Sequence, residues 1–147
     1  MNGFESLPVE LIAEILGELD LESLIVVSYL SRRLHSVASD SSLNPWRRPI
    51  LRNLLVQPGV SYESCLKHLS VRGTVPRQNF VEVLSLARAE WVILHFTWPN
   101  LKEAEWEECF KRRFLPGWQK WKKDGDTWRS TFRAYATSSP SSPCRSD

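Results

Sequence analysis

Side chains capable of acid–base or nucleophilic chemistry are scattered through this chain. It has three widely separated histidines, His35, His68 and His95. No Ser or Cys stands beside one of them in a nucleophile-and-base pattern, and the sequence holds no Gly-rich phosphate loop. Glu10, Glu14 and Glu18 recur at four-residue steps, so on a helix they form a row of like charges that faces water, not a pair of carboxylates across a cleft. We therefore expect no catalytic residues and no enzyme activity.

The cysteines, Cys65, Cys109 and Cys144, are far apart and odd in number. Because they form no Cys-x-x-Cys pair and have no histidine at metal-ligand spacing, they predict neither a disulfide framework nor a metal site, and we expect no cofactor. Free cysteines fit a reducing compartment. The N-terminus lacks a secretory signal pattern, and no apolar run approaches the roughly 18 residues of a membrane span. These features predict a soluble protein of the cytoplasm, the nucleus or both, with no membrane contact.

Basic and aromatic residues are interleaved between Lys111 and Arg133. This segment holds eight bases and two acids, a composition that could neutralise phosphates and stack on bases. No recognised RNA-binding or DNA-binding motif surrounds it, so nucleic acid is the less favoured partner. Trp118, Trp121 and Trp128 are the candidates here for a substrate contact or a secondary contact. Since tryptophan is mostly buried in folded proteins, we favour packing in a core, with the basic residues solvated around it.

Three short helices are expected in the N-terminal part of the chain. Pro8 suits the first turn of a helix because it has a fixed φ and no N–H. Behind it the apolar residues form two adjoining rows, one of Leu7, Leu11 and Ile15 and the other of Ile12, Leu16 and Leu19. Asp20 can cap a second helix, and Ser28 or Ser31 a third. So small a unit, with apolar residues on more than one helix face and no disulfide or metal, predicts a partner or packing on the rest of the chain.

The same segment, residues 5–46, resembles an F-box. The resemblance rests on the Leu7-Pro8 opening followed by Glu10, on the aliphatic pairs after it, on Asp20-Leu21 and on the closing Trp46. It implies docking on the Skp-type adaptor of an SCF ubiquitin ligase and, through it, a link to a cullin, with an unknown protein substrate presented for ubiquitination. Other subunits would carry out the transfer. The residues implied in adaptor binding are Leu7, Pro8, Leu11, Ile12, Ile15, Leu16, Leu24, Val27 and Trp46.

More helices are predicted beyond Trp46. One short helix buries Ile50, Leu51, Leu54 and Leu55 and stops at Gln57-Pro58-Gly59. Others begin after Ser61, which can act as a cap, and at Val75-Pro76. Residues 91–98 have the β-branched and aromatic content of a strand but no second strand to pair with, so we favour a buried helix there. Residues 101–114 place acids early and bases late, as the helix dipole favours.

The fold class that follows is all-α. We predict a three-helix F-box in residues 1–46, a small Trp-rich helical region in 47–136 that is a substrate-binding or linker unit, and a disordered Ser/Pro tail in 137–147. The predicted function is that of an F-box adaptor subunit of an SCF-type ubiquitin ligase. Two alternatives stay open: a nucleic-acid-binding module built on residues 111–133, and an F-box scaffold that works outside ubiquitin ligases.

The role of residues 47–136 also has two interpretations. They are either a small substrate receptor in their own right or the start of a longer receptor that is cut short. The expected helix from Trp128 to Tyr135 carries apolar residues that need a partner layer, yet it runs directly into the Ser/Pro tail. This favours the truncated receptor.

Overall fold

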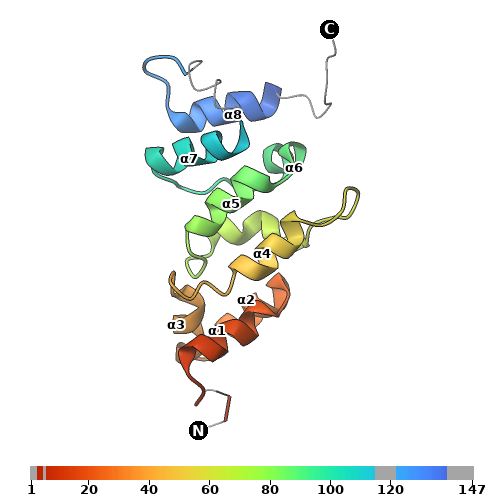
Figure 1. The fold of residues 1–147 in the computed structure, drawn as a ribbon, viewed down its shortest axis with the longest axis vertical. Helices are drawn as coiled ribbons and strands as arrows, with labels where there is room; N and C mark the ends of the chain where they lie inside the picture. Colours follow the sequence, from red (N-terminus) through yellow and green to blue (C-terminus); the bar gives the residue numbers. More distant parts are fainter. Residues whose placement is uncertain (1–2, 5, 115–121, 139–147) are drawn as a thin grey trace. The chain divides into compact units, whose positions relative to one another are not determined.

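All the secondary structure that the described residues contain is helical. The computed structural model describes residues 3–4, 6–114 and 122–138 of the chain (Figure 1). Within these ranges there are helices and loops but no strand. The expected all-α fold class is therefore confirmed. The chain divides into two compact units, Met1–Phe80 and Val81–Asp147, and the predicted 1–46 module lies inside the first of them.

The helices are short and follow one another closely. In the order of the chain they are α1 (Val9–Gly17), α2 (Leu21–Ser28), α3 (Arg32–Ser39), α4 (Arg47–Leu54), the 3₁₀ helix η1 (Ser64–Val71), α5 (Gln78–Leu86), α6 (Ala89–Leu94), α7 (Glu103–Arg113) and α8 (Trp128–Ser138). The boundary between the two compact units falls within α5.

Local capping residues begin the first three helices. Pro8 stands immediately before α1, one position earlier than the expected first turn, and its φ of −54° leads the backbone into the helix. Asp20 caps α2, because its carboxylate accepts a hydrogen bond from the Ser23 N–H at 2.8 Å. Ser31 caps α3 by accepting from the Leu34 N–H at 3.1 Å. Of the two serines considered for this cap, Ser28 is instead the buried last residue of α2.

The core of the first unit is built from one face of each helix. In this unit α1 and α2 both pack on α3, α1 also packs on α4, and α2 also packs on η1. The fully buried larger side chains of this core are Ile12, Leu16, Leu21, Leu24, Trp46, Ile50, Leu66 and Leu69. The indole N–H of Trp46 donates to the Ala38 carbonyl at 2.9 Å, so the ring is buried without leaving its polar atom unpaired.

Two segments of the chain differ from the sequence expectation. The element after residue 60 is a 3₁₀ helix that begins at Ser64, and Glu63, not Ser61, is the residue that precedes it. Residues 91–98 are only partly helical, because α6 ends at Leu94 and residues 95–98 have no helical structure. Leu94 itself is exposed. The expected helix is therefore correct for residues 91–94 and wrong for the rest of the segment, and within the helix the expected burial is correct for Val92 alone.

Aromatic side chains hold the second unit together. In this unit α8 packs on both α7 and α6, and Phe132 of α8 is fully buried. Its ring lies 5.8 Å from those of Trp98 and Trp106 and 5.6 Å from that of Phe114. The layer that α8 was expected to lack is thus supplied by α6 and α7. The apolar residues of α8 therefore no longer distinguish between the two interpretations of residues 47–136.

Helix α7 has the charge distribution expected from the sequence. Glu103 and Glu105 occupy its first turn, whereas Lys111, Arg112 and Arg113 occupy its last, so both ends complement the helix dipole. Most of the predicted tail, residues 139–147, lies outside the described residues, and Thr137 and Ser138 belong to α8.

Candidate docking surface

The two apolar rows of α1 have different environments. Ile12, Ala13 and Leu16 are buried, because this face of α1 packs on α3 and α4. Leu11 and Ile15, one helical turn apart on the other row, remain 47% and 42% exposed. A short helix that leaves two large aliphatic side chains in water has an unpartnered apolar row. This row is the first part of the candidate surface.

The second part of the surface lies at the end of α2. Its buried face consists of Leu21, Leu24 and Ser28, and three large apolar side chains at the end of α2 and just after it are exposed. They are Val26, Tyr29 and Leu30. Leu30 is 68% exposed because it precedes α3, whose buried residues are Leu34, Val37 and Ala38. We call these exposed apolar residues the docking surface. They are Leu11, Ile15, Val26, Tyr29 and Leu30.

The residues predicted to bind a partner fall into two groups. Pro8, Leu11 and Ile15 are exposed, and Leu7 and Val27 are half-buried. The other four predicted residues are in the core: Ile12, Leu16, Leu24 and Trp46. Sequence reasoning missed Val26, Tyr29 and Leu30. Recognition of Ser31 as the cap of α3 would have placed Tyr29 and Leu30 in the link between the helices.

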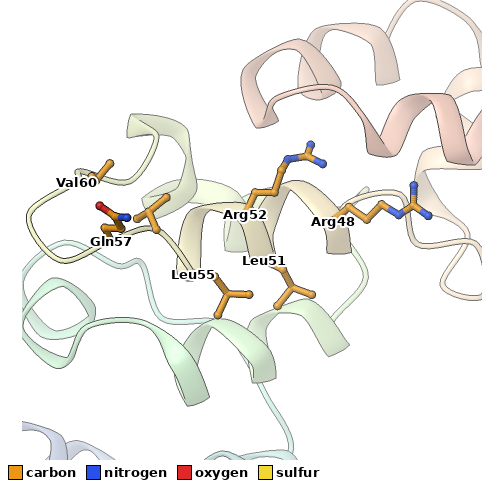
Figure 2. A pocket seen from close by; sticks show the side chains of 7 residues that line it. Arg48, Leu51, Arg52, Leu55, Gln57 and Val60 are labelled. Atoms are coloured by element: carbon orange, nitrogen blue, oxygen red, sulfur yellow. The ribbon is translucent and has the colours of Figure 1, made fainter.

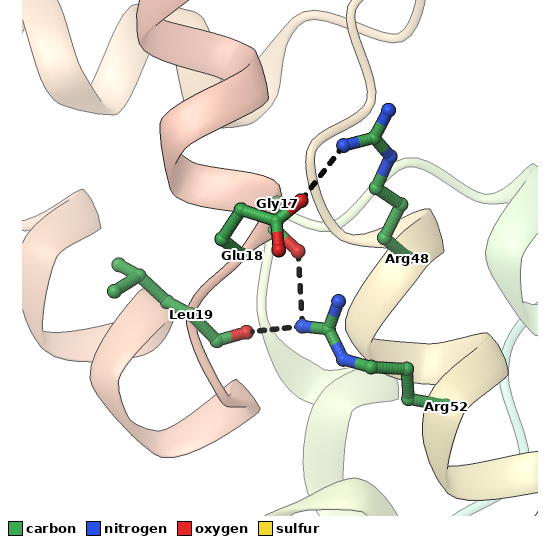
Figure 3. Close-up of polar contacts among 5 residues, drawn as sticks. All are labelled: Gly17, Glu18, Leu19, Arg48 and Arg52. Atoms are coloured by element: carbon green, nitrogen blue, oxygen red, sulfur yellow. Dashed lines mark hydrogen bonds and ion pairs between the residues drawn. The ribbon is translucent and has the colours of Figure 1, made fainter.

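Polar contacts close the C-terminal end of α1 (Figure 3). Arg52 of α4 donates to the carbonyls of Gly17 and Leu19 at 2.9 and 2.8 Å. Arg48, one turn earlier in α4, forms an ion pair of 3.0 Å with Glu18. The last carbonyls of a helix have no partner within the helix, so the Arg52 guanidinium supplies the bonds that the end of α1 lacks. Gly17 leaves room for Arg48, since a Cβ there would stand 3.3 Å from the Arg48 side chain.

Polar contacts also close the N-terminal end of α2. Glu63 accepts from the Leu21 N–H, which lies 3.2 and 3.3 Å from its two carboxylate oxygens. Asn53 of α4 is paired with Glu63 in both directions: its side-chain amide donates to the carboxylate at 2.7 Å and its side-chain oxygen accepts from the Glu63 N–H at 2.8 Å. Asp20 and Glu63 therefore satisfy two different free N–H groups of the same helix end.

Residues 4–52 match the family model described as F-box-like. The N-terminal segment is an F-box-like domain. The family resemblance predicted from the sequence is thus confirmed, and the match ends within α4, beyond Trp46. An F-box-like domain is a protein-interaction module, and such domains commonly bind Skp-type adaptors. Comparisons with curated proteins and with solved structures gave no match.

An open apolar hollow of about 690 Å³ lies beside α4 (Figure 2). Its apolar lining consists of Leu51, Leu55, Val56 and Val60. Leu55 was expected to be buried with Ile50 and Leu54, but it is 71% exposed, because α4 ends at Leu54. Leu51 is half-buried. The apolar face predicted for this helix is therefore correct for Ile50 and Leu54 and wrong for Leu55.

Three basic residues of the second unit, Lys111, Arg112 and Lys122, interact with side chains of the same unit. Lys111 pairs with Glu107 at 2.8 Å and Arg112 with Glu108 at 3.1 Å. Lys122 lies 5.4 Å from the centre of the Trp128 ring, which is half-buried and packs on Phe110. The other two predicted contact tryptophans, Trp118 and Trp121, lie outside the described residues.

The two described cysteines are not reactive thiols. Burial raises the pKa of the Cys65 thiol, and burial raises that of Cys109 to about 12, so both stay protonated near neutral pH. Among the residues that the structure describes, no group of three His, Cys, Asp or Glu side chains could hold a metal ion. No helix in the described ranges is long and apolar enough to span a bilayer.

Proposed function

We propose that this chain is an F-box adaptor subunit of an SCF-type ubiquitin ligase. It docks on a Skp-type adaptor, is linked through it to a cullin, and presents a protein substrate for ubiquitination. The observation that carries the proposal is that the F-box-like segment, residues 4–52, also carries the unpartnered apolar row of Leu11 and Ile15. The chain itself carries out no chemistry in this scheme.

In this proposal the predicted contact residues have two roles. Leu7, Pro8, Leu11, Ile15 and Val27 touch the adaptor directly, as an apolar helix face laid into a groove. The buried residues Ile12, Leu16, Leu24 and Trp46 form the core that holds the two helices in place. Val26, Tyr29 and Leu30 extend the contact beyond the residues that the sequence indicated.

The second unit is the part that we propose presents the protein substrate. It has an aromatic core of its own, and Leu86 and Leu94 remain exposed on it. The packing of α8 against α6 and α7 gives this unit a core of its own on which such a surface can be carried. A place in the cytoplasm or the nucleus follows from the proposed ligase function.

A nucleic-acid-binding role has less support. Lys111, Arg112 and Lys122 already interact with carboxylates or with an indole ring. Phe114 and Phe132, two aromatic residues of the same segment, are buried. Binding that rests on phosphate contacts would fall steeply as salt rises. Apolar docking on an adaptor would change little with salt, so a salt titration distinguishes the two functions.

The proposed function is tested by co-purification of the full chain with a Skp-type adaptor and a cullin. The double variant Leu11→Ala with Ile15→Ala should lose the adaptor, because truncating a Leu or Ile in a well-packed site costs about 2–5 kcal/mol. Alanine favours the helix, so α1 should persist. The matched control is Leu86→Ala with Leu94→Ala, which removes similarly exposed residues of the second unit.

Each outcome of this experiment has a clear meaning. Loss of the adaptor by the α1 variant alone supports the proposed docking surface. Undiminished binding by the α1 variant contradicts it. A wild-type chain that retains the adaptor but recruits no cullin would instead indicate the non-ligase scaffold.

A further inference from the structure

Three residues form a polar network around residues 18–20, the corner between α1 and α2. One of them is the last residue of the F-box-like segment, and the other two follow that segment in the sequence. Arg52, the last residue of the family match, bonds the carbonyls of Gly17 and Leu19 at the end of α1. Glu63 bonds the Leu21 N–H at the start of α2. Asn53 links these two residues, because it is the neighbour of Arg52 in α4 and is hydrogen-bonded to Glu63. We call Arg52, Asn53 and Glu63 the corner clamp.

We propose that Glu63 is a positioning residue for adaptor docking, which it controls by fixing the first turn of α2 against the end of α1. The inference rests on the proposed function, since it concerns the same docking surface. It also goes beyond the family match, because Glu63 lies outside residues 4–52.

The geometry explains why the corner needs this support. Only residues 18–20 separate α1 from α2, and the docking surface takes residues from both helices. The two helices each pack on α3, but contacts between α1 and α2 themselves are few. Besides their common packing on α3, the two helices are therefore held relative to each other by groups that bond to the two sides of the corner. A contact surface assembled from two helices loses affinity when one of them shifts by about 1 Å.

Glu63 is itself held in place on several sides. The residues after it form η1, whose Leu66 and Leu69 are fully buried and which packs on α2. Asn53 is buried, and its amide also donates to the Pro49 carbonyl at 2.9 Å. The carboxylate thus meets the α2 N-terminus from a fixed position, and its negative charge complements the positive end of that helix.

The variant that tests the clamp is Glu63→Gln. Its neutral amide loses the negative charge that complements the start of α2, and it places an NH₂ group where one of the two carboxylate oxygens accepted from the Leu21 N–H. We expect adaptor affinity to fall by roughly tenfold, the equivalent of one lost charged hydrogen bond. The matched rescue adds Asn53→Asp, which provides an acceptor for the new amide and should restore part of the affinity. Asn53→Asp alone places two carboxylates face to face and should bind more weakly than this double variant.

A second readout separates positioning from general stability. The backbone amide resonance of Leu21, followed by NMR in the free full-length chain, should shift in Glu63→Gln and should exchange faster with solvent. The control Val75→Ala truncates another buried residue of the same unit and takes no part in the clamp. It should lower the free energy of unfolding without moving the Leu21 resonance or weakening the adaptor affinity.

The affinities are measured with a purified Skp-type adaptor and the full chain. Weaker binding by Glu63→Gln, with partial rescue and a shifted Leu21 resonance, supports the inference. It is overturned if Glu63→Gln binds like wild type, or if Val75→Ala at equal loss of stability binds equally poorly. A wild-type chain that binds no Skp-type adaptor would instead overturn the proposed function, and the positioning role with it.

Discussion

Asn44 and Asn79 form a reciprocal amide pair in the first unit. Each side-chain amide donates to the other's side-chain oxygen, at 3.0 and 2.7 Å. Asn79 is fully buried, and Asn44 has a φ of 39°, in the left-handed region that Asn tolerates better than most residues. The pair therefore joins the loop before α4 to the first turn of α5 through two partly buried hydrogen bonds.

The variant Asn79→Ala should destabilise the first unit by about 1–3 kcal/mol, because it removes both bonds and leaves the polar atoms of Asn44 without these partners. Urea unfolding followed by circular dichroism measures this free energy. Asn79→Asp is the matched comparison: it keeps an acceptor for the Asn44 amide but buries a carboxylate opposite the Asn44 oxygen, so its loss should be at least as large. Equal stability of Asn79→Ala and wild type would show that the pair contributes nothing.

The Asp20 cap should make stability depend on pH. Hydrogen bonds from the Ser23 side chain and N–H lower the pKa of Asp20 below its ordinary value of 3.8. Since the folded pKa is the lower one, the cap's contribution is present above pH 3.8 and is lost as pH falls through the folded pKa. The stability difference between wild type and Asp20→Ala should accordingly be largest at neutral pH and shrink in acid.

Thermal melts of the two proteins between pH 2.5 and 7 measure this difference. Asp20→Asn is the control, because Asn caps a helix about as well as Asp but does not titrate. Its difference from Asp20→Ala should stay constant over the same range. A wild-type difference that grows in acid would contradict the assigned direction.

The caps were predictable because they depend on neighbouring residues alone. Asp20 could be assigned to α2 from the apolar pattern that follows it, and the outcome agrees. Which of the two apolar rows of α1 is buried and which is exposed could not be predicted in the same way. Leu11 and Ile12 are neighbours on the helix and belong to equally apolar rows. Ile12 is buried because α3 and α4 pack on its side of α1.

The contacts of Glu63 were also not predictable from the sequence. Its partners, Leu21 and Asn53, lie 42 and 10 residues away in the sequence, and no periodic pattern connects them. Ser61 was the better cap by residue type, but the chain turns helical only after Glu63. Contacts that tertiary structure creates were therefore the part of the candidate site that the sequence did not reveal.

Cys109 should resist alkylation in the folded protein. Its thiol is fully buried and its pKa is raised to about 12, so very little thiolate is present at pH 8. Iodoacetamide treatment of the native chain, followed by peptide mass spectrometry, should leave Cys109 unmodified. The same treatment in urea should modify it fully. Rapid native labelling of Cys109 would show that α7 opens readily.

Phe132 should be essential to the second unit alone. It is fully buried and its ring lies within 6 Å of those of Trp98, Trp106 and Phe114, so Phe132→Ala should cost about 3–5 kcal/mol through lost burial and the cavity left behind. Every residue of the docking surface belongs to the first unit. We therefore expect the variant to keep its Skp-type adaptor in co-purification while amide exchange in α7 and α8 accelerates.

The control Arg133→Ala changes an exposed neighbour and should affect neither measurement. Loss of the adaptor by Phe132→Ala alone would mean that docking requires an intact second unit, and the docking surface would then have to be redrawn.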